Sequence, residues 1–192
     1  MRTVTLTIGL LLLATIPVVG QRYFQITSEG AGAIKLGMTV AQARLAMKGH
    51  RLKRTSDGEG VALIEVTKNG RDVMTLYAGE EDRDAKINEN AKIEQIWVRD
   101  PLYRTVSGIH PDMLVKDAEK IMGPVVRVFM SEIESREFVE FRKKVKSITF
   151  RVDVNSEGQY LTAGIYPAGQ RRGTRCVPTA KIVSVWVSHY FD

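Results

Sequence analysis

The sequence has little cysteine: Cys176 is the only one among 192 residues. A single thiol excludes a disulfide within the chain, so packing must stabilise the fold. It also excludes the cysteine-rich zinc sites, and the three histidines stand too far apart in the sequence to match the spacings of zinc ligands. The sequence therefore predicts no metal site and no cofactor.

Signatures of nucleophilic catalysis are also missing. The chain contains no Gly-x-Ser-x-Gly elbow and no Ser-x-x-Lys pair. Cys176 could act as a nucleophile with His50, His110 or His189 as its base, but no family signature surrounds it. We interpret Cys176 as a small packing residue and expect the protein not to be an enzyme, with no catalytic residue assigned. An unrecognised enzyme that uses Cys176 or scattered acidic residues stays open as an alternative.

Long apolar runs are confined to the start of the chain. A positively charged first pair of residues is followed by the uncharged run Thr3–Val19, and a Val-x-Gly junction ends at Gly20. We expect residues 1–20 to be a signal peptide, so that the mature chain starts at Gln21, is periplasmic or secreted, and keeps no membrane span. The alternative is an uncleaved anchor, although the run is slightly short and contains Pro17.

Charge of one sign does not dominate. The chain has 28 Lys and Arg against 22 Asp and Glu, and both signs are spread along its length. This spread argues against nucleic acid as the partner. Two basic clusters are candidate sites for an anion or a partner, since arginine binds phosphate and carboxylate in a bidentate manner. They are Arg142, Lys143 and Lys144 between two predicted strands, and Arg171, Arg172 and Arg175 in a predicted loop. The alternative is that these segments are charged simply because loops are solvated.

An octapeptide that occurs twice is the most informative feature of the chain. Ala91–Val98 returns as Ala180–Val187, and the two copies contain the only tryptophans, Trp97 and Trp186. An apolar stripe upstream of each copy also recurs in the same order: Ile34, Met38, Val40, Ala43 and Met47 return as Ile109, Met113, Val115, Ala118 and Met122. We interpret this as a tandem duplication, with repeats at 21–103 and 104–192 and an inserted loop near 167–178 in the second repeat.

Each repeat is expected to be one helix followed by antiparallel strands. Thr39 and Gln42 form a capping-box pattern at the first helix, and Asp112 is the expected N-cap of the second. Asn69-Gly70 predicts a type I′ hairpin. The expected strands are Val61–Lys68, Arg71–Ala78 and Ala91–Val98, then Val125–Met130, Glu137–Arg142, Ser147–Val154 and Tyr160–Tyr166. The predicted fold class is therefore α+β, with two helix-plus-antiparallel-sheet modules.

Over residues 24–188 the chain resembles the sigma-E-regulated lipoprotein family of the bacterial envelope. The likeness lies in Ile26–Gly32, the first helix and hairpin, the Ile93–Asp100 strand running into Gly108-Ile109, and the closing Lys181–Val187 strand. The repeat layout is also similar to the modules of secreted β-lactamase inhibitor proteins. Gln21 stands where the family carries its lipid-attachment cysteine, and the family's cysteine pair is missing. The resemblance therefore implies an envelope protein but neither a lipid anchor nor any catalytic residue.

These observations leave three hypotheses for the function. The first is an exported, non-enzymatic envelope protein that binds a protein or an anionic surface polymer. The second is a secreted enzyme inhibitor, by analogy of layout alone. The third is the unrecognised enzyme. The sequence favours the first, because duplicated sheets without catalytic spacing suit binding best.

Overall fold

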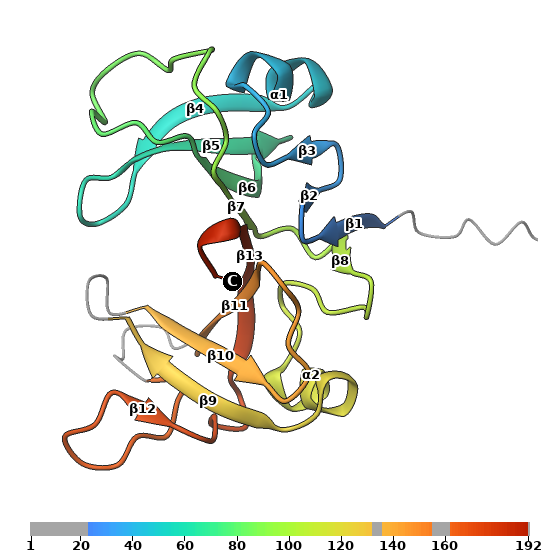
Figure 1. The fold of residues 1–192 in the computed structure, drawn as a ribbon, viewed down its shortest axis with the longest axis vertical. Coiled ribbons are helices and arrows are strands. Elements are labelled where there is room, and N and C mark those ends of the chain that lie inside the picture. Colours follow the sequence, from blue (N-terminus) through green and yellow to red (C-terminus); the bar gives the residue numbers. More distant parts are fainter. Residues whose placement is uncertain (1–22, 132–135, 155–161, 192) are drawn as a thin grey trace, which may run out of the picture.

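The computed structural model describes residues 23–131, 136–154 and 162–191, so the predicted signal peptide lies outside the described residues. A nine-stranded sheet forms the body of the molecule and a four-stranded sheet lies beside it (Figure 1). The small sheet contains β1 (Phe24–Thr27), β2 (Gly30–Ala31), β3 (Ile34–Lys35) and β8 (Tyr103–Thr105). The large sheet contains β4 (Arg51–Ser56), β5 (Ala62–Lys68), β6 (Arg71–Tyr77), β7 (Gln95–Val98), β9 (Val125–Met130), β10 (Glu137–Phe141), β11 (Ile148–Asp153), β12 (Arg172–Gly173) and β13 (Lys181–Ser188). Its order is β12-β9-β10-β11-β13-β7-β6-β5-β4.

The predicted α+β class with two separate modules is wrong. The described chain is mainly β-sheet, with two short α-helices, α1 (Val40–Ala46) and α2 (Val115–Met122), and the 3-10 turn η1 (His189–Phe191). We expected a separate sheet in each half. Instead β13 pairs with β7 across the junction of the halves, so that the main strands of both halves form one sheet. The apolar stripes did mark helices, but each helix has only about two turns. Strands β1 to β3, β4, β8 and β12 carry too short or too polar a pattern to be predicted, and they shift the balance toward β.

Strand order is mirrored about the central β7–β13 pair. Reading outward, the first half gives β6, β5 and β4, and the second half gives β11, β10 and β9. Backbone hydrogen bonds near the helices repeat as well. The matched pairs are Val40 N to Ala91 O (3.0 Å) with Val115 N to Ala180 O (2.9 Å), and Ile93 N to Met38 O (2.8 Å) with Ile182 N to Met113 O (2.9 Å). The two halves thus share one arrangement, while the repeat boundary at 103/104, which β8 crosses, stays a prediction.

The two helix starts differ from each other. The predicted capping box is confirmed at α1: the Gln42 N–H donates to Thr39 Oγ1 (3.2 Å) and the Thr39 N–H donates to Gln42 Oε1 (2.9 Å). The predicted Asp112 cap is wrong, because α2 starts after Leu114 without a side-chain cap. Asp112 has a φ of 68°, as Gly37 has 79° at the matching place in the first half, so Asp112 serves the turn before the helix.

Most of the predicted strands are present within a residue or two of their expected ends. Asn69 and Gly70 join β5 to β6 with φ of 51° and 76°, as a type I′ hairpin requires. The predicted strand 160–166 is wrong over its described part, since residues 162–166 contribute only the isolated bridge Gly164↔Cys176; residues 160 and 161 lie outside the described residues. The predicted loop 167–178 contains β12, which pairs with β9 at the sheet edge.

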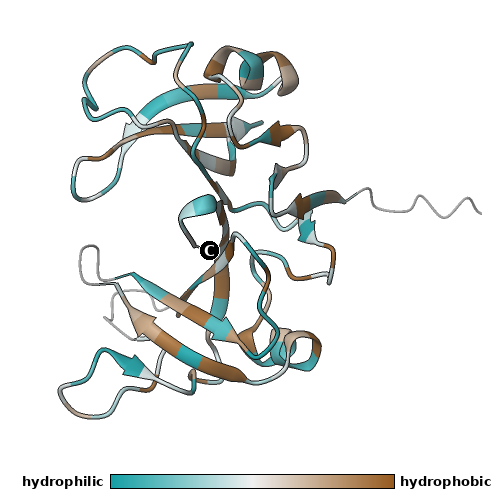
Figure 2. Cartoon of the chain, in the orientation of Figure 1, coloured by the Kyte–Doolittle hydropathy of each residue, from teal (hydrophilic) through white to brown (hydrophobic). Residues whose placement is uncertain are grey.

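The nine-stranded sheet has two faces of different character. In Figure 2 brown residues predominate along β9 and β10, with a few teal residues among them. Burial alternates residue by residue along β11, as expected for a strand with one buried side. One face packs with the buried side of both helices and of the small sheet in a single large core that includes Val40, Ala118 and Ile26. The other face carries a second, smaller cluster built on Leu63, Trp97, Phe138 and Trp186, which we call the aromatic face.

An ion pair joins the two halves above the aromatic face. An Arg136 Nη atom lies 3.4 Å from the Asp57 carboxylate, and the two side chains are 13% and 3% exposed. The Arg136 guanidinium also lies 5.0 Å from the Trp97 ring centroid and 5.5 Å from that of Trp186. Asp57 Oδ1 accepts the N–H groups of Glu59 and Val61, so the same carboxylate shapes the β4–β5 turn. The ion pair therefore connects the β4–β5 turn of the first half to the start of β10 in the second half.

We predict that Asp57→Asn lowers the free energy of unfolding by about 3 kcal/mol, because it removes the negative partner of a buried ion pair. Asparagine retains the oxygen that accepts the turn N–H groups. Asp117→Asn is the matched control, since its ion pair with Lys120 is exposed and should contribute little to stability. Urea unfolding of both variants measures the difference, and equal losses would contradict this assignment.

Candidate functional site

A row of matched side chains crosses the aromatic face. In the first half, the register of neighbouring strands places Lys53, Glu65, Thr75 and Trp97 side by side. Trp97 pairs with Trp186 of the second half, and Trp186 pairs with Thr149. On the next two strands of the second half, Glu140 pairs with Arg127. Each half therefore carries a tryptophan at the centre, a threonine, a glutamate and an outer cation. The strands that carry the outer cations, β4 with Lys53 and β9 with Arg127, lie at or next to opposite edges of the sheet (Figure 1).

The two tryptophans form the centre of this face. Their rings stack with centroids 4.2 Å apart and planes 9° from parallel, and each residue is 6% exposed. Each indole N–H donates to a side chain two residues earlier on its own strand: Trp97 to Gln95 Oε1 at 3.0 Å and Trp186 to Ser184 Oγ at 2.7 Å. Both tryptophans are therefore buried packing residues of the aromatic face.

All six predicted basic residues are exposed, but the structure does not gather them. Arg142 follows β10, and its N–H bonds Pro124 O (3.0 Å) just before β9 begins. Arg171 lies at the other end of β9, where its carbonyl accepts the Met130 N–H (3.0 Å). The two predicted clusters, Arg142 to Lys144 and Arg171 to Arg175, therefore lie at opposite ends of one strand. The first cluster borders a small cavity of about 100 Å³ through Lys143 and Lys144. The second borders a cavity of about 590 Å³ through Arg172 and Arg175.

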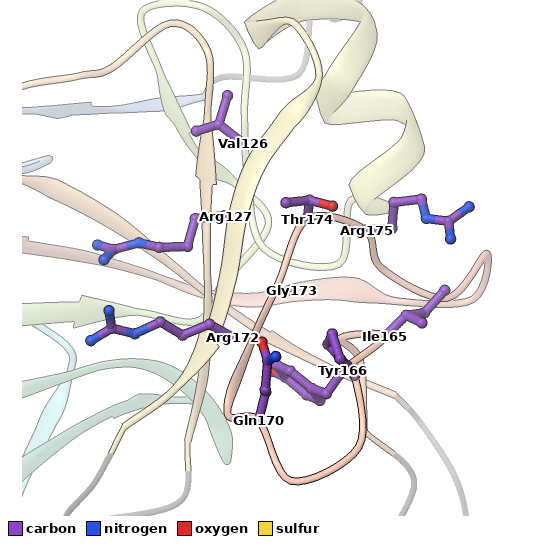
Figure 3. Close-up of a pocket in the computed structure, with 10 residues that line it drawn as sticks. Val126, Arg127, Ile165, Tyr166, Gln170, Arg172, Gly173, Thr174 and Arg175 are labelled. Carbon is purple, nitrogen blue, oxygen red and sulfur yellow. The ribbon is translucent and has the colours of Figure 1, made fainter.

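The pocket opens where β12 leaves the sheet. Strand β12 pairs with β9 at only two positions, Arg172↔Phe129 and Gly173↔Val128. Beyond Gly173 a cavity of about 590 Å³ lies between β9 and the loop, and we call it the edge pocket. Arginine and apolar side chains line it together: Arg127, Arg172 and Arg175, with Val126, Ile165 and Tyr166 (Figure 3). Arg127 and Arg172 extend to the same side of β9, whereas Arg175 extends to the other side.

Arg127 is a site residue that sequence reasoning missed. It forms an ion pair with Glu140 on the neighbouring strand, and its guanidinium lies 4.5 Å from the Phe129 ring centroid. Its Nε is buried and has no hydrogen-bond partner among the described residues. The signal in the sequence is a lone arginine in the apolar strand Val-Val-Arg-Val-Phe-Met. Only the register of β9 with β10 and β12 shows that this arginine stands opposite Glu140 and two residues from Phe129, the partner of Arg172.

A buried carboxylate holds one wall of the edge pocket in place. Glu137 is 7% exposed and accepts the backbone N–H groups of Ala163 (2.6 Å) and Gly164 (2.8 Å) and the hydroxyl of Tyr166 (2.7 Å). Burial, together with the bond to Glu137 and its charge, raises the pKa of Tyr166 far above the usual range for tyrosine. Tyr166 therefore stays a neutral donor, and Glu137 positions residues 163–166 against β12.

Cys176 lies half-buried next to this wall and pairs with Gly164 in an isolated bridge. Burial raises the pKa of its thiol to about 12, and the negative charges of Glu137 and Glu119 act in the same direction. A nucleophilic cysteine needs the opposite shift. Within the described ranges, no three His, Cys, Asp or Glu side chains are grouped so as to hold a metal ion.

We predict that Cys176 reacts slowly with a thiol reagent at pH 7 and that its labelling rate keeps rising about tenfold per pH unit beyond pH 9. An ordinary thiol reaches its plateau near pH 9, because its pKa is about 8.5. The urea-unfolded chain is the control and should label like a free cysteine. A plateau below pH 8 in the folded protein would contradict the raised pKa.

Comparisons with known proteins place the fold and leave the activity open. No family model and no curated protein matches the chain. Among solved structures, the chain is similar to the uncharacterized protein yfeY from Escherichia coli, at 14% identity and a TM-score of 0.52, over 85% of this chain and 99% of that one. No helix in the described part of the chain is both long and apolar enough to cross a membrane. The likeness is one of fold, and it agrees with the envelope-family resemblance at that level.

Proposed function

We propose that the protein is an exported, non-enzymatic binding protein that recognises an anionic partner at the edge pocket. The observation that carries this proposal is the placement of Arg127 and Arg172 on adjacent strands, extending to the same side (Figure 3). Guanidinium groups bind carboxylate and phosphate oxygens through paired N–H donors. A strand scaffold holds the two groups more firmly than a loop would, so less side-chain entropy is lost on binding.

The surrounding charge supports an anionic partner. Arg172 and Arg175 are exposed, and no acidic side chain in the described part of the chain forms an ion pair with either. Glu140 compensates only Arg127. The whole chain carries a formal charge of +6, which attracts polyanions at low salt.

Export and an envelope location are part of the same proposal. They rest on the signal-peptide pattern of residues 1–20 and on the resemblance to the sigma-E-regulated lipoprotein family. Membership of that family is also proposed here, because a likeness at 14% identity to a solved structure supports a shared fold only. The raised pKa of Cys176 favours binding over an enzyme that depends on this thiol.

We predict that the mature protein binds lipopolysaccharide and the carboxylate polymer alginate, and that Arg127→Ser with Arg172→Ser weakens both at least about tenfold. The salt dependence of binding should flatten, because exposed charges are screened within about 10 Å at 0.1 M salt. Lys53→Ser with Arg142→Ser is the control, since it removes the same charge away from the edge pocket. A salt series by surface plasmon resonance gives the comparison. Equal weakening by both double variants, or no binding by the wild type, would contradict the proposal.

A further inference from the structure

We infer that strand β4 binds an extended, acidic peptide segment, which pairs with it as an added strand of the large sheet. The site is the outer edge of β4, at the opposite end of the sheet from β12 and the edge pocket (Figure 1). This inference is independent of the anion binding proposed at the edge pocket. Three observations lead to it: the open backbone groups of β4, the strand that covers the matching edge in the second half, and the charges beside the edge.

The outer edge of β4 offers a row of backbone hydrogen-bonding groups. Directly after β4, the Asp57 N–H points toward β5 and donates to Val61 O (3.4 Å). Backbone groups alternate in direction along a strand, so Leu52, Arg54 and Ser56 turn theirs away from β5. No strand lies on that side in the described part of the chain, and no hydrogen bond to another described residue engages these groups. Their N–H and C=O groups are therefore open to a neighbouring strand.

Strand β4 lacks most of the features that close the edge of a sheet. All 6 of its residues pair with β5 without a register shift, and its sequence, Arg-Leu-Lys-Arg-Thr-Ser, contains neither proline nor glycine. At the opposite edge, β12 has only 2 residues. Edge strands are usually protected by short length, bulges, proline or charge. Of these features β4 has only charge, and charge selects among partners instead of excluding all of them.

The second half shows a strand bound along the matching edge. In the mirrored strand order β9 takes the place of β4, and Arg127 stands where Lys53 stands. Strand β12 pairs antiparallel with β9, and the Met130 N–H donates to Arg171 O (3.0 Å). Counted from the matched cations, Met130 corresponds to Ser56, whose N–H also points outward. The same arrangement of strands therefore accepts a short extended segment at this edge.

The side chains beside the edge determine the charge of the partner. Arg51 and Lys53 are exposed, and they share one face of the sheet because they are two residues apart. Glu65 stands opposite Lys53, but the register places no acidic residue opposite Arg51. On the other face, Glu80 already pairs with Arg54. One positive charge thus remains at the edge, and an acidic side chain on the added strand would stabilise the pairing by standing opposite Arg51.

The same charges disfavour a second copy of the chain as the occupant. Directly opposite residues of antiparallel strands share a face, so two copies of β4 related by a two-fold axis pair one residue with itself. The registers that pair most of the strand are centred on Lys53 or on Arg54. Either register sets like charges directly opposite each other, which destabilises the pairing. A strand with acidic residues at alternate positions meets no such repulsion.

The test is fluorescence polarisation of a labelled, end-blocked peptide, Thr-Glu-Val-Glu-Val-Glu-Thr, titrated with the mature protein. We expect it to bind at least about tenfold more tightly than the same peptide with lysine in place of glutamate, because the edge is basic. Arg51→Glu should weaken binding about fivefold, since it turns an opposite-charge pair into a like-charge pair. Lys144→Glu is the matched control: it makes the same change at an exposed position between β10 and β11 and should leave the affinity unchanged.

Two N-methylated forms of the peptide test whether its backbone is recognised in addition to its charge. Methyl groups on alternate nitrogens block one edge of an extended peptide, and the complementary set blocks the other edge. One form should bind at least about tenfold more weakly, because it cannot pair with β4, and the other should keep its affinity. Ser56→Pro should also weaken the unmodified peptide, since it removes an outward N–H at an edge where proline is tolerated.

The contradicting outcomes are distinct from a failure of the edge-pocket proposal. Equal binding of the two methylated forms, or equal effects of Arg51→Glu and Lys144→Glu, would overturn the inference. Self-association of the protein that Ser56→Pro abolishes would also overturn it and would assign the edge to a second copy. Arg172→Ser should leave the peptide affinity unchanged, and a loss with this variant would place the peptide at the edge pocket instead of β4.

Discussion

The stacked pair Trp97 and Trp186 is the contact on which the rest of the structure depends. It sits where β7 meets β13, so it joins the two halves into a single nine-stranded sheet. The two strands carry similar sequences, and each indole N–H donates to a side chain two residues earlier on its own strand. Arg136 closes over the pair and reaches Asp57 in the other half. A buried aromatic stack with a desolvated ion pair above it makes separation of the halves costly.

The edge pocket shows how one half of a repeated fold acquires a separate chemistry. Both halves keep a cation and a glutamate at the same place in the row, but only the second has extra chain to form β12. That strand places Arg172 opposite Phe129, on the same side of β9 as Arg127, and Gly173 packs against Ile165. Glu137 fixes the wall behind it through the N–H groups of Ala163 and Gly164. Burial, with the charge of Glu137, raises the pKa of the neighbouring Cys176 thiol.

Much of the local structure could be predicted from the sequence, because it depends on neighbours in the chain. The capping box at Thr39 and the Asn69-Gly70 hairpin are decided within four residues. The repeated octapeptide also gave the symmetry of the halves. The fold class could not be predicted, since β12 and the small sheet are short and exist through pairing with distant strands. For the site, Arg172 and Arg175 could be named from composition, but Arg127 could not, because its role depends on register with β10 and β12.

The joining of the halves through the tryptophan pair is tested most directly by a double-mutant cycle. The free energy of unfolding is measured by urea denaturation for the wild type, Trp97→Ala, Trp186→Ala and the double variant. We expect each single variant to lose about 3–5 kcal/mol and the cycle to give a coupling energy of about 1 kcal/mol, with one cooperative transition in the wild type. Additive losses, or two separate transitions in the wild type, would contradict the view that this stack unites the two halves.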